Sequence, residues 1–361
     1  MDFIPQIEPS FDEKEADAVR EYVLSGGWGT EFKKTAEFES RLAEFTGAGH
    51  CIVTTSGTIA LTLALLARGI GPGDEVIVPD LTMIATANAA TLIGAKPKFV
   101  DVEPETLNID IAQVERAIGP KTKAVIHVSL NGRSNDLDAL VRLCRERGLH
   151  LVEDAAQSLG SYYGDRHLGT IGDVGCLSFS MPKVITTGQG GAVLTNDAEI
   201  AAKARKLKDF GRSGGGNDIH VSIGFNFKFT DFQAVVGIEQ MAKLPKRLAR
   251  KKDIWRRYRE GLSGIDEIAW IETDTDKVAP WFVEIFIAGR ETLADELREK
   301  GIGTRPIYPP IHAQKAIGLD NLSFPVTEDY AARGLWLPSS VTITDQQIDY
   351  TSRAIQAFFG G

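Results

Sequence analysis

Short runs of hydrophobic residues alternate with longer stretches of helical periodicity between about residues 50 and 200. The runs predict strands, and the stretches between several of them predict amphipathic helices. The predicted strands are Val76–Pro79, Lys98–Asp101, Ala124–Leu130, Leu151–Asp154, Cys176–Ser180 and Ala192–Thr195. The predicted helices are Ile59–Arg68, Ile84–Ile93, Ile111–Ile118 and Leu137–Arg147. This alternation predicts an α/β fold with a mostly parallel central sheet covered on both faces.

The pattern changes in the last third of the chain. A long helical stretch runs from about Thr230 to Leu262, and Pro245 within it is expected to break or kink the helix. A strand at Trp281–Ile287 and helices at Leu293–Lys300 and Asp345–Phe359 follow. We therefore predict a large domain over residues 1–240 and a smaller C-terminal α+β domain over residues 241–361.

Composition narrows the functional classes. The chain has 361 residues, of which 43% are hydrophobic, and a formal net charge of -9. A nucleic-acid partner is not expected, because such proteins usually show a basic excess. No apolar run is long enough to span a bilayer, and the start of the chain does not read as a signal peptide, so we expect a cytoplasmic protein without membrane association. The three cysteines lack the spacing of a metal or disulfide framework, and no metal site is predicted.

Polar residues with chemical potential follow the predicted strands. In parallel α/β folds, ligands bind beyond the carboxyl ends of the strands. Asp154 and Gln157 follow one strand, whereas Ser178 and Lys183 belong to the end of another. A buried carboxylate such as Asp154 needs a cationic partner, and a protonated pyridine nitrogen would serve; capping of the next helix is the alternative.

Lys183 stands alone in an apolar, glycine-rich segment between two predicted strands. A partly desolvated lysine has a lowered pKa and becomes a nucleophile suited to a Schiff base. A surface lysine in a hairpin loop accounts for the same segment.

The start of the first predicted helix offers a phosphate site. Gly57, Thr58 and Ile59 follow Ser56, and free N–H groups at a helix N-terminus bind phosphate. A simple N-cap by Ser56 or Thr58 accounts for the same residues. Asn226 and Lys228 form a further candidate pair, interleaved with phenylalanines just before the long helix, where core packing or an exposed loop are the alternatives.

The order and spacing of these motifs resemble the DegT/DnrJ/EryC1/StrS family of sugar aminotransferases, which have the type I fold of transferases that depend on pyridoxal 5'-phosphate. The resemblance covers nearly the whole chain, and the matching segments are Gly26–Trp28, Ser56–Thr58, Gly71–Pro79, Gly94–Pro97, Glu153–Gln157, Ile185–Gly191, the Asn226 segment, and Thr304–Pro306 through His312. Some branches of the family act as dehydratases and have histidine at the lysine position; Lys183 therefore favours a transaminase.

The resemblance implies roles for individual residues. Lys183 would carry the cofactor and shuttle protons, Asp154 would pair with the pyridine nitrogen, and Gln157 would bond the ring hydroxyl. The cofactor phosphate would lie at Gly57, Thr58 and Ser178. Asn226 would reach the cofactor of the neighbouring subunit, which implies a homodimer with shared active sites. Arg305 and His312, and with them Lys228, would belong to the substrate pocket.

Two departures from the family affect the substrate more than the chemistry. Met83 stands where relatives usually have an aromatic residue on the cofactor ring; a thioether can contact a ring as well. Arg133 ends the segment Val128–Arg133, where relatives typically read Val-His-Leu-Tyr-Gly-Gln. It is either a cation for a phosphate or carboxylate or an exposed turn residue.

We therefore predict a transaminase that moves nitrogen from L-glutamate to a nucleotide-linked keto-sugar and resembles the perosamine-synthase type. The alternatives are transamination of a smaller phosphorylated ketone and a non-catalytic regulatory or binding protein of the same fold. The second alternative predicts the loss of Lys183 or Asp154, and both are present.

Overall fold

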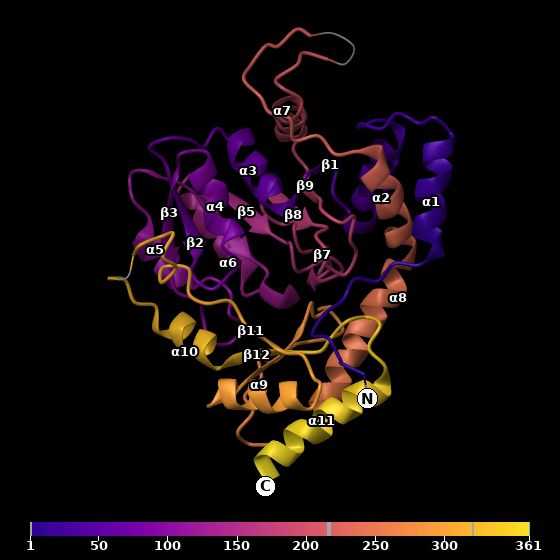
Figure 1. The fold of residues 1–361 in the computed structure, drawn as a ribbon. Coiled ribbons are helices and arrows are strands. Elements are labelled where there is room, and N and C mark those ends of the chain that lie inside the picture. Colours follow the sequence, from indigo (N-terminus) through magenta and orange to yellow (C-terminus); the bar gives the residue numbers. More distant parts are fainter. Residues whose placement is uncertain (1, 215–217, 320, 361) are drawn as a thin grey trace.

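The computed structural model describes residues 2–214, 218–319 and 321–360. Its centre is a seven-stranded sheet in the order β1-β9-β8-β5-β4-β2-β3 (Figure 1). In that order the strands are His50–Thr54, Gly191–Thr195, Val174–Ser178, His150–Asp154, Thr122–Val128, Glu75–Pro79 and Lys96–Val100. β3, β2, β4, β5 and β8 pair in parallel, whereas β9 is antiparallel to both of its neighbours. The predicted mostly parallel α/β sheet is confirmed.

Helices cover both faces of this sheet. α3 (Gly57–Ala67), α4 (Ala85–Leu92) and α7 (Ala198–Lys208) share one apolar core with the sheet. α5 (Ile111–Ala117) and α6 (Leu137–Glu146) pack on other strand residues, and α2 (Lys33–Thr46) packs with the first half of α8 against β1, β8 and β9. α3 is apolar all round, as expected for a helix buried on every side.

The C-terminal part contains a second sheet. Its three antiparallel strands lie in the order β10 (Val283–Phe286), β12 (Gly334–Leu337) and β11 (Arg305–Pro306). The helices of this part are α9 (Arg290–Glu299), α10 (Pro325–Arg333) and α11 (Asp345–Gly360), and α9 and α11 share a core with β10 and β12. α1 (Glu13–Leu24), the 3-10 turn η1 (Leu130–Gly132) and the short hairpin of β6 (Tyr162–Tyr163) and β7 (Arg166–His167) complete the elements.

One long helix joins the two parts of the molecule. α8 runs from Asp231 to Gly261 and continues through Pro245, so the predicted break at this proline is wrong, whereas the alternative, a kink, stays a prediction. Ala234 and Ile238, in its first half, pack in the core beside β1, whereas Ile254 and Tyr258 pack against the C-terminal sheet. The predicted domain boundary at residue 240 falls inside this helix and stays a prediction. Among the described residues, no helix combines the length and apolar character that crossing a bilayer requires.

Candidate active site

A cavity of about 330 Å³ lies where the start of α3 meets the ends of β5 and β8 and the edge strand β11. Sequence reasoning named eight of its lining residues: Gly57, Thr58, Met83, Asp154, Gln157, Ser178, Lys183 and Arg305. Residues from five separate stretches of the chain thus share one cavity. The lining also includes Trp281 and Tyr308, to which sequence reasoning gave no role.

Lys183 lies against an aromatic wall. Its Nζ is 3.9 Å from the centroid of the Trp281 ring. Trp281 in turn donates its indole N–H to the carbonyl oxygen of Pro182 at 2.8 Å, which fixes the backbone just before the lysine. Burial lowers the pKa of Lys183 to about 8, although the charge of Asp154 raises it; Arg305 lowers it further. A lysine with this pKa is a nucleophile near neutral pH.

Asp154 ends β5 as a buried carboxylate. Oδ2 accepts a hydrogen bond from the Thr86 hydroxyl at 2.8 Å, and Oδ1 accepts one from the Ala156 N–H at 3.2 Å. Burial raises the pKa of Asp154, and both hydrogen bonds oppose that rise. Since no arginine or lysine forms an ion pair with this carboxylate among the described residues, a cationic ring nitrogen in the cavity would complete its environment.

Gln157 is oriented by the loop after β4. Its Oε1 accepts the backbone N–H of Asn131 at 2.8 Å. The amide NH₂ therefore remains available on the side of the cavity, as a donor for a ring hydroxyl oxygen.

The start of α3 is built for a close anionic ligand. Ser56 caps the helix by accepting the Ile59 N–H at 3.2 Å, and the N–H groups of Gly57 and Thr58 have no acceptor among the described residues. A Cβ on Gly57 would lie 2.8 Å from the Cβ of Ser178, so only glycine allows the helix to approach β8. Free N–H groups, the helix dipole and the Ser178 hydroxyl together suit a phosphate. The two interpretations of this motif, an N-cap and a phosphate site, are both compatible with the observed structure.

Of two other predicted cofactor contacts, Met83 lines the cavity and Ile59 does not. Met83 is exposed and lines the cavity, and its sulfur accepts the Ala85 N–H at 3.0 Å. Ile59 does not line the cavity, and its N–H is used by the cap. Ile59 is therefore placed to support the helix start and not to touch a ligand there.

Arg305 lines the same cavity, among aromatic rings. Its guanidinium is 4.6 Å from the centroid of the Trp336 ring and 5.4 Å from that of Phe282. No carboxylate pairs with it among the described residues. Tyr308 packs edge-on against Trp336 and lines the same cavity, and burial raises the pKa of its phenol. The aromatic residues of Trp281–Phe282 could be recognised in the sequence only as candidate core.

His312 and Arg133 lie outside the cavity. His312 is buried, with its Nδ1 2.6 Å from Asp80 Oδ2 and its backbone N–H bonded to Asp80 Oδ1. It holds the segment after β11 against the end of β2 and does not line this cavity, and its place in the substrate pocket stays a prediction. Nη1 of Arg133 lies 2.6 Å from Glu284 Oε1, and the arginine side chain is almost fully buried. It is neither a ligand-facing cation nor an exposed turn residue, because a carboxylate far along the chain takes its charge.

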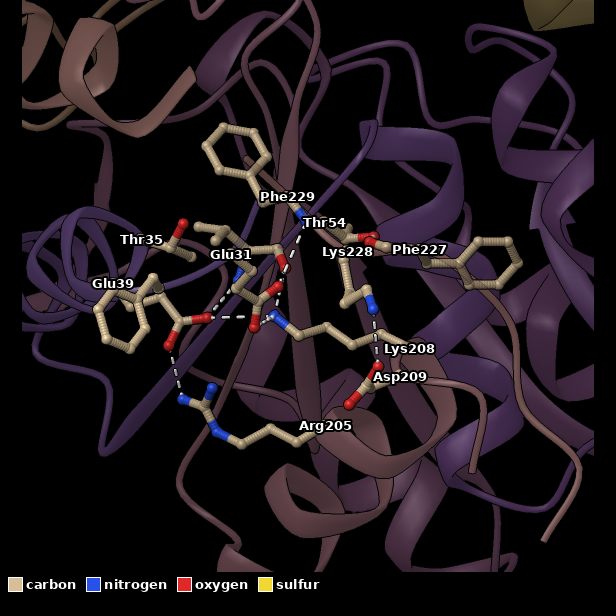
Figure 2. Close-up of polar contacts among 12 residues, drawn as sticks. Glu31, Thr35, Glu39, Thr54, Arg205, Lys208, Asp209, Phe227, Lys228 and Phe229 are labelled. Carbon is tan, nitrogen blue, oxygen red and sulfur yellow. Dashed lines mark hydrogen bonds and ion pairs between the residues drawn. The ribbon is translucent and has the colours of Figure 1, made fainter. Parts of the chain in front are cut away.

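Asn226 and Lys228 lie on another face of the protein. Figure 2 shows Lys228 pointing to Asp209, whose Oδ1 lies 2.9 Å from the lysine Nζ. Neither residue lines the cavity of this chain. The segment is fixed from beneath: Phe227 accepts the Thr54 hydroxyl through its carbonyl oxygen, and Phe229 donates its N–H to Glu31.

The charges beneath this segment are largely buried. Lys208 is 2% exposed, and its Nζ lies 2.9 Å from Glu31 and 3.5 Å from Glu39 (Figure 2). Glu39 also pairs with Arg205 at 2.8 Å. This network connects α7 and α2 to the segment that contains the exposed Asn226, so the segment is presented outward on a rigid base.

Comparison with known proteins agrees with this geometry. The model of the DegT/DnrJ/EryC1/StrS aminotransferase family matches residues 9–356. GDP-perosamine synthase of Escherichia coli O157:H7 is 34% identical over 99% of both chains, and that of Vibrio cholerae is 34% identical over 99% of both.

Solved structures superpose over almost the whole chain. A DegT DnrJ EryC1 StrS aminotransferase from Brucella abortus has a TM-score of 0.91 at 33% identity, over 97% of this chain and 96% of its own. Spr1654 of Streptococcus pneumoniae, solved in a PLP form, has a TM-score of 0.93 at 28% identity, over 99% of both chains. The chain therefore belongs to the DegT/DnrJ/EryC1/StrS aminotransferase family and is a PLP-dependent transaminase of the type I fold.

Proposed function

We propose that this transaminase moves an amino group from L-glutamate to the keto group of a GDP-linked sugar. The observation that carries the proposal is the shared cavity of Lys183, Asp154, Gln157 and the free helix start at Gly57. The nucleotide is proposed from the relatives named GDP-perosamine synthase. The phosphorylated-ketone alternative loses its support, because the Arg133 charge that suggested it is paired with Glu284.

The cofactor, pyridoxal 5'-phosphate, supplies an electron sink for the carbon that loses or gains a proton. Asp154 would keep the ring nitrogen protonated, Gln157 would donate to the ring hydroxyl oxygen, and the N–H groups of Gly57 and Thr58 would hold the phosphate. Lys183 would hold the cofactor through Nζ. Once the donor amine has displaced Nζ from the cofactor, the freed Lys183 amine would take a proton from Cα of the donor and later deliver one to the sugar carbon.

Arg305 is the proposed partner of the donor carboxylate. It is the one cation besides Lys183 among the described lining residues of the cavity, and it lies close enough to lower the pKa of that lysine. An α-carboxylate sits one bond from the reacting carbon, so it needs a cation near Lys183. A planar guanidinium binds a carboxylate through two parallel hydrogen bonds.

The surface around the Asn226 segment supports a homodimer as part of this proposal. Large apolar side chains are exposed there, at Trp28 (66%), Phe32 (54%), Val221 (56%) and Ile223 (83%). The described residues that follow α7, before and after residues 215–217, project away from the body of the molecule (Figure 1). An exposed apolar surface of this kind favours association, and a second copy would bring Asn226 and Lys228 to the neighbouring cavity.

An absorbance spectrum after addition of pyridoxal phosphate tests the proposal. We expect a visible band in the wild type that L-glutamate bleaches, and no such band in Lys183→Ala. Lys251→Ala is a matched control, because Lys251 is a second buried lysine that does not line the 330 Å³ cavity. This variant should keep the band. A wild type without the band, or a Lys183→Ala variant with the same band, would contradict the proposal.

A further inference from the structure

Three residues of the C-terminal sheet form a row that ends at the cavity. Trp336 on β12 is directly opposite Glu284 on β10 and directly opposite Arg305 on β11. Directly opposite residues of antiparallel strands lie on the same face of a sheet. The Trp336 indole N–H donates to Glu284 Oε2 at 3.4 Å. The Arg305 guanidinium carbon lies 4.6 Å from the centroid of the Trp336 ring.

Arg133 closes the far end of this row. Its Nη1 is 2.6 Å from Glu284 Oε1, and the two side chains are 4% and 5% exposed. Arg133 also donates Nε–H to the carbonyl oxygen of Thr106 at 3.1 Å. A buried charge without its partner is strongly unfavourable, so Arg133 and Glu284 fix each other's positions.

The same loop reaches the cofactor side of the cavity. Asn131 has a positive φ of 53°, and its side-chain amide bonds the backbone of Phe282 twice, at 2.7 and 2.9 Å. Its backbone N–H is the group that orients Gln157. A single loop, residues 129–133, therefore contacts both Gln157, which lines the cavity, and the β10 region that contains Glu284.

We propose that Arg133, Glu284 and Trp336 are positioning residues that set the place of Arg305 for the donor carboxylate. This inference rests on the role of Arg305 proposed above. Arg305 has no carboxylate partner of its own among the described residues, so the rings of Trp336 and Phe282 are what locate it. Glu284 locates Trp336, and Arg133 locates Glu284. The unusual arginine of the loop thus acts on the substrate through the sheet and not by direct contact.

The test is a double-mutant cycle on the half-reaction with L-glutamate, followed by bleaching of the visible band. Glu284→Gln keeps the shape of the side chain and removes its charge. We expect the apparent dissociation constant for glutamate to rise roughly tenfold, while the limiting rate stays within about twofold. In an Arg305→Met background, Glu284→Gln should have no further effect on that constant, because the residue through which it acts is absent.

Two further variants separate positioning from simple loss of stability. Ile285→Val changes the neighbouring residue of β10, which packs in the core on the opposite face of the sheet, and should leave the glutamate dependence unchanged. The double variant Arg133→Met/Glu284→Met removes both charges and should bind glutamate more tightly than Arg133→Met alone.

Each outcome decides between the two proposals. An equal effect of Glu284→Gln with and without Arg305, or no effect in either background, overturns the positioning inference while the transaminase stands. An apparent dissociation constant for glutamate in Arg305→Met that equals the wild-type value also overturns the positioning inference. A wild type that glutamate does not bleach at all overturns the proposed donor, and the inference falls with it.

Discussion

The surroundings of Lys183 decide its reactivity. The amine lies over the Trp281 ring and within the electrostatic influence of buried Asp154 and of Arg305, which has no carboxylate partner in the described part of the chain. Burial disfavours its charged form, the negative charge of Asp154 favours it, and the positive charge of Arg305 disfavours it. The net result is a lysine that loses its proton far more easily than an exposed one.

The rate at which the apoenzyme combines with pyridoxal phosphate should therefore rise with pH and level off with a midpoint near 8. Only the neutral amine attacks an aldehyde, so the midpoint reports the pKa of Lys183. Asp154→Asn should move this midpoint to lower pH, and Arg305→Met should move it to higher pH. Stopped-flow absorbance measures the rate; shifts in the same direction for both variants would contradict this account of the lysine.

α8 is the element that connects the two parts of the molecule, and it contains an internal proline. Pro245 has no N–H to donate to the preceding turn, yet the helix runs on for sixteen residues to Gly261. The helix persists because its apolar face is buried on both sides of the proline, at Leu244 beside the large sheet and at Ile254 beside the small one. Tertiary packing has overcome an unfavourable residue.

Pro245 is exposed, so Pro245→Ala should restore a helical hydrogen bond without disturbing the core. We expect the free energy of unfolding to increase by about 1 to 2 kcal/mol, because proline costs about 3 kcal/mol in a helix interior and gives some of this back by restricting the unfolded chain. Urea denaturation measures the change.

Pro325 provides the comparison, since it lies in the first turn of α10. Proline is favoured at that position, and Pro325→Ala should not stabilise the protein. If Pro245→Ala and Pro325→Ala changed the free energy of unfolding equally, the position of the proline in its helix would not be the cause of the stabilisation.

At the scale of the whole molecule, the proposed shared site requires two chains. Asn226 is exposed and does not line the cavity of its own chain, and its segment is tied to the body of the protein through Glu31, which pairs with Lys208. Its proposed role is therefore assigned to the site of the neighbouring subunit.

Mixing two inactive proteins tests this arrangement. Lys183→Ala lacks the catalytic amine, and Asn226→Ala lacks the proposed contact to the partner's site. After unfolding and refolding together, hybrid dimers should contain one competent site, and activity should return to about a quarter of the wild-type value, since random pairing makes half of the dimers hybrid. Separately refolded samples that are mixed afterwards are the control. No recovery in the hybrids would place Asn226 in its own subunit's site or outside any site.

Much of the fold and the cofactor side of the site could be predicted from the sequence. The hydrophobic runs at β2, β4, β5 and β9 were recognisable because buried parallel strands and their neighbours are apolar along their whole length. β1 was missed although it is as long as β2, and β12 was missed as well. The two residues of β11 are too few for a periodic pattern. Lys183, Asp154 and Gln157 follow strand ends, and the topology brings strand ends together.

The substrate side was decided by tertiary structure alone. His312 and Arg133 both have the chemistry of ligands, but Asp80 and Glu284 lie 232 and 151 positions away in the chain, and no local pattern announces such partners. The charge of a side chain is local to its residue, whereas the partner that takes up that charge is chosen by packing. The family, the sheet and Lys183 as the candidate cofactor residue could be recognised in the sequence. The folded structure was needed to show that Arg305 has no carboxylate partner among the described residues, because burial and pairing exist only once distant segments meet.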